Sequence, residues 1–271
     1  MNKRFKYPVF SYILFLWVVF SFLSCTPEWK LARKFKNNER VAKVLILPAD
    51  ELILENLNYQ SADYHTSIDS SALLKLIEEP DFLEYYYNSL INELDRLKIN
   101  VYLEQTEVLQ DTLPGMLINV AQILLEESNE KFNAEAIFSG VTHTQTLYQN
   151  CVDFHYWFEV SHIDKPDDLQ ILYDTEYLCD TVEGYFYQKF WTGKVLFEKE
   201  IKPVDVEDIY DKAKKTGVKH ARMFFDILMN RYIEDHYPKN KQPDFLLHYN
   251  AEREFLEPLN PETDLFEVIE D

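Results

Sequence analysis

Large apolar residues occupy every second position of the segment 152–160. Val152, Phe154, Tyr156, Phe158 and Val160 alternate with Asp153, His155, Trp157 and Glu159. A period of two places the first group on one face of a β-strand and the second group on the other. The chain must therefore build a sheet with one covered face, because a row of large apolar side chains is stable only against a core.

Two further segments extend this pattern into hairpins. Asp164 to Asp167 predicts a turn, after which residues 169–177 return as a strand. Residues 185–190 and 195–201 form another predicted pair that meets at Gly193, where glycine accepts the positive φ of a tight turn. The second half of the sheet is thus predicted to be antiparallel.

The first half of the chain follows a different order of elements. Residues 41–48 predict a buried strand, residues 81–97 a helix with Tyr87 on its core stripe, and residues 99–103 a second strand. Pro114 suits the first turn of a second helix ending near Lys131. The apolar stripe of that helix would contain Leu117, Val120 and Leu124. Residues 134–141 then predict a third strand.

The predicted fold class is therefore α/β to α+β. A βαβαβ unit is followed by antiparallel hairpins and a C-terminal helix, in a three-layer or two-layer arrangement around a mixed sheet. Asp205 is expected to cap that last helix. Residues 41–237 are expected to form a single domain because no flexible linker divides them, and residues 238–271 form an acidic tail.

The N-terminus has the order of features found in export signals. Positive residues precede the apolar run 9–23, which ends in Phe22-Leu23-Ser24-Cys25. This end resembles the lipobox of bacterial lipoproteins, although Phe22 and Leu23 depart from its commonest form. The resemblance implies a signal peptide over residues 1–24, cleavage before Cys25, and lipid attached to that cysteine.

Two consequences of this resemblance concern location. Thr26 rather than Asp follows the cysteine, which by similarity to sorting in some Gram-negative bacteria implies the outer membrane. The alternative is an uncleaved signal anchor, since the apolar run is somewhat short for a spanning helix. Both readings hold the rest of the chain outside the cytoplasm on a membrane tether, with the lipoprotein expected to face the periplasm.

Charge is unevenly distributed along the chain. The formal net charge is −20, which argues against nucleic acid as a partner because phosphate binding needs a basic surface. Residues 25–40 are nevertheless basic and are expected to form a lipidated, membrane-proximal tether. Its cations would contact the headgroups of the membrane, namely Lys30, Arg33, Lys34 and Lys36.

The acidic tail also contains large apolar residues that a simple solvated tail would not need. We expect it to serve recognition rather than folding, with docking on its own domain and plain disorder as the alternatives. The candidate partner-docking residues are Phe255, Leu256, Leu265 and Phe266.

The motifs of familiar enzymes are missing from the sequence. There is no Gly-rich phosphate loop, no Gly-x-Ser-x-Gly elbow and no His-Glu-x-x-His pair. His155 and His162 point to opposite faces of one strand, and Asp174 and Glu176 are expected on a solvated strand face. We therefore expect no catalytic residue, no cofactor and no metal.

Two short motifs carry a further resemblance. These are Ala134-Glu135-Ala136-Ile137-Phe138-Ser139-Gly140 and Trp191-Thr192-Gly193-Lys194-Val195-Leu196-Phe197. Together with the order of elements they are similar to an α/β domain of outer-membrane lipoproteins. That domain is shared by the curli secretion channel subunit, the lipoprotein activators of penicillin-binding proteins and the N-terminal domain of the Tol-system translocation protein. The present chain has Glu135 where the family tends to have Asp.

Cys151 and Cys179 form an even pair in an oxidising compartment, so a disulfide has to be considered. Direct opposition of the two cysteines would set Phe154 against Glu176 and Tyr156 against Asp174. A shift by one residue pairs aromatic residues with each other and sends the cysteines to opposite faces. We therefore expect two separate thiols.

Three functions remain open at this point. The preferred one is a non-enzymatic, membrane-anchored protein that contributes a binding surface to a cell-envelope assembly or a secretion system. A ligand-binding or catalytic lipoprotein with a pocket at the strand ends is the alternative. Self-assembly into a pore would require amphipathic strands, for which only residues 134–201 qualify.

Overall fold

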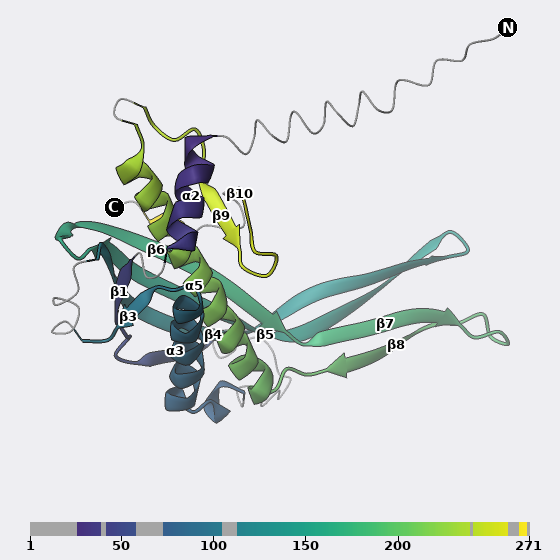
Figure 1. The fold of residues 1–271 in the computed structure, drawn as a ribbon. Helices are drawn as coiled ribbons and strands as arrows, with labels where there is room; N and C mark the ends of the chain where they lie inside the picture. Colours follow the sequence, from purple (N-terminus) through teal and green to yellow (C-terminus); the bar gives the residue numbers. More distant parts are fainter. Residues whose placement is uncertain are drawn as a thin grey trace, which may run out of the picture.

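The computed structural model describes residues 26–38, 42–57, 73–104, 113–238, 241–259 and 266–269. Strands dominate this part of the chain, and the longest helix stands near its C-terminal end (Figure 1). The helical elements are α2 (Pro27–Asn37), the 3-10 turn η3 (Leu74–Leu76), α3 (Glu79–Arg96) and α5 (Val206–His236). The strands are β1 (Lys43–Leu47), β2 (Leu52–Asn56), β3 (Asn100–Tyr102), β4 (Gly115–Phe138), β5 (Val141–His162), β6 (Lys165–Cys179), β7 (Thr181–Gln188), β8 (Val195–Lys202), β9 (Leu247–Asn250), β10 (Phe255–Pro258) and β11 (Glu267–Ile269).

The main sheet is mixed and has seven strands in the order β11-β6-β5-β4-β1-β3, with β2 also paired to β4. β1 and β2 lie one after the other along β4 and run parallel to it. β4, β5, β6 and β11 pair antiparallel. The predicted fold class of a mixed α/β sheet with antiparallel hairpins and a C-terminal helix is confirmed.

The helices α3 and α5 cover one face of this sheet, which makes the domain two-layered (Figure 1). Gly217 lets the two helices approach closely, because a Cβ atom there would lie 2.5 Å from the backbone oxygen of Tyr86. Asp205 caps α5 as expected, accepting a hydrogen bond from the Asp208 amide at 2.9 Å.

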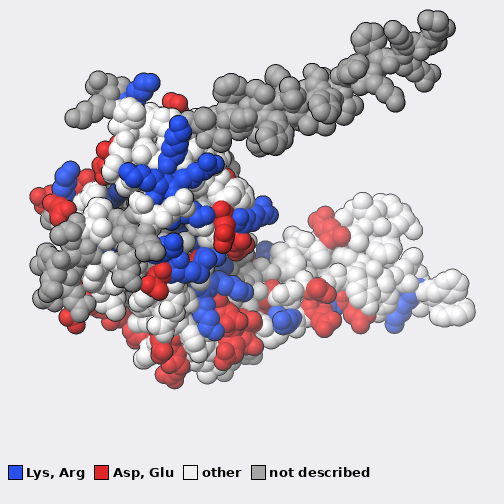
Figure 2. All heavy atoms as spheres, viewed as in Figure 1, with Lys and Arg blue, Asp and Glu red and all other residues white. Residues whose placement is uncertain are grey.

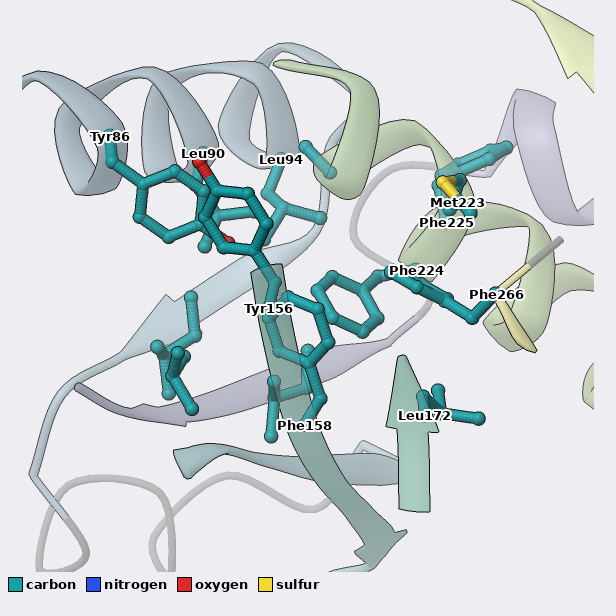
Figure 3. Packing of buried hydrophobic residues seen from close by; sticks show 14 of the residues in the cluster. Tyr86, Leu90, Leu94, Tyr156, Phe158, Leu172, Met223, Phe224, Phe225 and Phe266 are labelled. Atoms are coloured by element: carbon teal, nitrogen blue, oxygen red, sulfur yellow. The ribbon is translucent and has the colours of Figure 1, made fainter. Parts of the chain in front are cut away.

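The core lies between these helices and the alternating face of β5 (Figure 3). Phe158 points from β5 toward Phe224 of α5, and Tyr156 stacks against Tyr86 of α3. Leu90 and Leu94 of α3 are buried beside them. On α3 the buried tyrosine is Tyr86 rather than the predicted Tyr87. The alternating apolar residues of segment 152–160 are all buried in the core, as the sequence predicts.

The prediction of a second helix is wrong, because residues 115–138 form the long strand β4. Its buried positions are Met116, Ile118 and Val120, followed after an irregularity by Ile123 and Leu125. The bulge between Val120 and Gln122 adds a residue, so the buried spacing is briefly three instead of two. A strand with such a bulge has the apolar spacing of a helix.

The predicted third strand, residues 134–141, is not a separate core strand. Its residues are the far end of β4, and the chain turns back into β5 at Ser139 and Gly140. Both residues have positive φ, 51° and 81°, as a tight hairpin turn requires. The first motif of the family resemblance thus lies at the end of a hairpin and not in a central strand.

The cysteine prediction is also wrong: Cys151 and Cys179 are directly opposed and joined in a disulfide. This register does place Phe154 against Glu176 and Tyr156 against Asp174. The objection to it fails because cations of α5 reach down to the two carboxylates. The register of β5 and β6 also shifts between Val160 and His162. The turn that joins the two strands therefore does not determine which residues pair beyond this irregularity.

Both ends of the described chain pack on the domain. Ala32 and Phe35 bury one side of α2, and Phe35 lies against Phe225 of α5 at 5.4 Å between ring centres. β9 and β10 form a small hairpin beside α5, while β11 adds to the edge of β6. The folded unit therefore reaches beyond residues 41–237 in both directions.

Candidate functional site

Two hairpins project from the domain as separate arms (Figure 1). The pairing of β4 with β2 ends at Glu127, and the pairing of β5 with β6 begins at Cys151. Between these points residues 129–150 pair only with each other within the sheet, and we call them arm 1. β7 and β8 form a sheet of their own over residues 181–202, which we call arm 2.

The bases of the two arms are joined at one place. The disulfide Cys151–Cys179 ties β5 to the last residue of β6, and arm 2 starts two residues later. Asp180, the residue between, accepts hydrogen bonds from the amides of Asn150 and Val204 at 3.1 and 2.9 Å. The buried Glu127 accepts a further bond from the side-chain amide of Asn150 at 2.8 Å. These contacts fix where both arms leave the domain.

The tips of the arms expose large apolar side chains. Ile137 and Val141 of arm 1 are 72% and 58% exposed, and Phe190 and Trp191 of arm 2 are 86% and 91% exposed. Residues 136–152 and 184–197 contain no Asp or Glu, although the chain has 47 acids. Exposed aromatic residues in acid-free segments of an acidic protein are typical of a binding surface.

Arm 2 is ordered by its own packing. Phe186 and Phe197 face each other across the hairpin, with ring centres 4.8 Å apart. Gly184 provides the space, because a Cβ atom there would lie 2.2 Å from the ring of Phe197. The second motif of the family resemblance, residues 191–197, contains the tip of this arm and the start of β8.

The predicted lipid site Cys25 lies outside the described residues. Of the four predicted membrane-contact cations, Lys30, Arg33 and Lys34 are exposed on α2. Lys36 is engaged within the protein, because its amine donates to the backbone oxygen of Glu254 at 3.1 Å and lies over the ring of Tyr249. No helix in the described part of the chain combines the length and apolarity needed to cross a membrane.

Two of the predicted partner-docking residues of the tail, Leu256 and Phe266, are buried in the protein itself. Phe266 is 5% exposed and packs against Phe158 and Phe224, with ring centres 5.2 and 4.9 Å away. Leu256 is buried beside α5, whereas Phe255 is partly exposed on β10. Leu265 lies outside the described residues. Packing on the chain's own domain, and not recognition of a partner, accounts for the two buried side chains.

A partly buried polar network surrounds Asp174 and Glu176, in place of the predicted solvated strand face. Lys219 of α5 bonds to Asp174 at 2.8 Å and to Glu176 at 2.7 Å. His220 donates from Nε2 to Asp174 at 2.9 Å, and its Nδ1 accepts from the hydroxyl of Tyr86 at 2.8 Å. The sequence contained a signal for this, since a histidine and a lysine adjoin the apolar stripe of α5.

Burial lowers the pKa of His220, which stabilises its neutral form. Burial acts to raise the pKa of Asp174, but the hydrogen bonds from His220 and Lys219 outweigh it and lower that pKa. His220 and Tyr86 are fully buried, so no substrate reaches them. The network is therefore a structural one that holds α5 on β6.

The possible metal ligands also have structural partners. Glu130, Cys151 and Cys179 come together at the base of arm 1, but the two sulfurs are joined to each other. His155 bonds to Tyr173 and Glu126 at 2.6 and 3.1 Å. Neither place offers the free thiolate and imidazole set of a zinc site.

Comparison with known proteins finds no match for this chain, either among protein-family models or among curated proteins.

Proposed function

We propose that this chain is a lipid-anchored lipoprotein of the bacterial outer membrane that uses its two arms to bind a protein partner in an envelope assembly or secretion system. It acts without catalysis. The observation that carries the proposal is the pair of arms that project from the domain (Figure 1). Phe190 and Trp191, in the turn between β7 and β8 of arm 2, are almost fully exposed. Two adjacent aromatic side chains exposed at a projecting tip add almost nothing to the stability of the domain, and such patches are common in binding surfaces.

The form of the arms supports a protein as the partner. Each arm is a two-stranded ribbon whose outer edges carry no further strand in the described chain. Such edges accept an added strand from another chain, and the neighbouring tip residues supply apolar contact. The common base of the arms at Cys151–Cys179 sets their relative position, which reduces the entropy lost on binding.

The other end of the molecule supports anchoring. α2 begins two residues after Cys25 and presents Lys30, Arg33 and Lys34 to solvent. Each cation near an anionic surface contributes about 1 kcal/mol, which adds to the modest affinity of lipid chains alone. Since α2 packs firmly on α5, a lipid on Cys25 would hold the domain close to the membrane.

The arm proposal is tested with the double variant Phe190→Ser, Trp191→Ser. Wild-type cells treated with a chemical crosslinker should give a discrete adduct with a partner, and the variant should lose most of it. The matched control is Leu76→Ser on η3, which removes an apolar side chain 60% exposed from the domain and should keep the adduct. An adduct that survives in the tip variant contradicts the proposal.

The anchoring proposal has a separate test. Cys25→Ala should abolish incorporation of labelled fatty acid and leave the precursor unprocessed. Fractionation of wild-type cells should place the protein in the outer membrane. Unchanged labelling would reject lipidation, and residence in the inner membrane would reject the sorting step alone.

A second candidate function is self-assembly of several copies through the arms. Along arm 1, Phe132, Ala134 and Ala136 are half-buried on one face, while Lys131, Asn133 and Glu135 are exposed on the other. This amphipathic alternation is what strands at a lipid boundary show. Crosslinked adducts at multiples of the chain's own mass would favour this candidate over a different partner protein.

A further inference from the structure

A cavity of 530 Å³ lies between α5 and the turn that joins β9 to β10. Its charged lining consists of Lys214, Lys215, Lys219 and Arg222 from α5 and of Glu252 opposite, and His248 lies beside them. Cations thus outnumber the single acid in a chain whose net charge is −20. Figure 2 shows basic side chains gathered over this face of the molecule, next to those of α2.

Three of the four cations of the cavity are positioned by acids that do not line it. Lys214 pairs with Asp211 at 2.9 Å, and Arg222 uses its Nε to reach Glu93 at 2.7 Å. Lys219 is held by Asp174 and Glu176 of β6, as described above. Because these three donors are already held in place, an anion that enters the cavity has to order few flexible side chains.

One carboxylate already occupies the edge of this cavity. Glu252 accepts from Nη1 of Arg222 at 3.2 Å, although its side chain is 75% exposed. An exposed ion pair of this kind contributes little to stability, so another oxyanion can replace it at small cost. The guanidinium group suits a phosphate oxygen pair in particular, and lysines add charge without fixed geometry.

We propose that this cavity binds a phosphate group, with Arg222 and Lys215 as its main contacts and Glu252 as the side chain that the phosphate displaces. The group belongs either to the headgroup of an anionic lipid or to a small soluble phosphate ester. The site is separate from the arms, and its existence does not depend on their function.

The test uses the full chain purified in zwitterionic micelles. Inorganic phosphate and glycerol phosphate are titrated by calorimetry, and co-sedimentation is measured with phosphatidylglycerol vesicles and with phosphatidylcholine vesicles. Binding of the soluble probes as well as the anionic vesicles identifies a soluble ester as sufficient. Binding of the anionic vesicles alone identifies the lipid headgroup only if Lys215→Glu weakens it, because the cations of α2 also attract an anionic surface.

Charge-reversal variants test whether the phosphate binds in this cavity and not elsewhere on the protein. Lys215→Glu should weaken binding at least tenfold, and Glu252→Gln should strengthen it, because the competing carboxylate is gone. The matched control is Lys199→Glu, an exposed lysine of arm 2, which should bind as wild type does. Equal weakening by Lys199→Glu and Lys215→Glu, or no binding to any probe, overturns the proposal.

Discussion

Aromatic residues have opposite surroundings in the domain and in the arms. Tyr156 and Phe158 are fully buried and Phe266 nearly so, whereas Phe190 and Trp191 are almost fully exposed. Burial of such a side chain contributes roughly 2–3 kcal/mol to folding, and an exposed one contributes almost nothing. The comparison teaches that the same residue type stabilises the fold in one region and remains available to a partner in the other.

Substitution of a buried aromatic residue should destabilise the protein far more than substitution of an exposed one in an arm. Phe266→Ala removes a ring packed among Phe158, Phe224 and His220, and should lower the free energy of unfolding by about 3–5 kcal/mol. Trp191→Ala in arm 2 should change it by less than about 0.5 kcal/mol. Urea unfolding followed by circular dichroism measures both. A similar loss from the two variants would show that the arm tip belongs to the folded core.

The next largest effect on stability is expected at the Cys151–Cys179 disulfide, where the arms join the domain. Replacing both Cys151 and Cys179 by Ala should cost about 2–4 kcal/mol, because the cross-link restricts the unfolded chain. The arms should also become more sensitive to limited proteolysis, since their shared base is loosened. Non-reducing mass spectrometry of the wild-type protein should find one intramolecular bridge. Two free thiols there would refute the observed register of β5 and β6.

A smaller effect is expected from pH, which should change the stability of the domain through the buried His220. Because burial lowers the pKa of His220, the folded protein resists its protonation, while the unfolded chain takes up that proton below about pH 6.5. Stability should therefore fall as the pH is lowered from 7.5 to 5.5. His220→Gln should flatten this dependence, and His143→Gln in arm 1 should not. An unchanged slope in His220→Gln would remove the histidine from the explanation.

How much the sequence predicts also differs between the regions. The alternation of residues 152–160 and the cap at Asp205 are local signals, and the structure confirms them. The burial of Phe266 is not predicted, because its partners lie more than 40 residues away and no local pattern reveals them. The register of Cys151 and Cys179 depended on Lys219 reaching across from α5 to the acids of β6.

The sequence also does not predict the two arms, for a related reason. The bulge after Val120 gave part of β4 the apolar spacing of a helix, so its length of 24 residues was not recognised. The available signal was the absence of acids from residues 136–152 and 184–197. In an acidic chain, such gaps mark surfaces that are not simply solvated.

The most direct test of the account is site-specific photo-crosslinking in living cells. A photo-reactive amino acid is placed at position 191 at the tip of arm 2, and at position 76 on the domain as the control. The account predicts a strong, discrete adduct with an envelope protein from position 191 and none from position 76. Adducts of equal strength from both positions, or an adduct from position 76 alone, would contradict the claim that the arms are the binding surface.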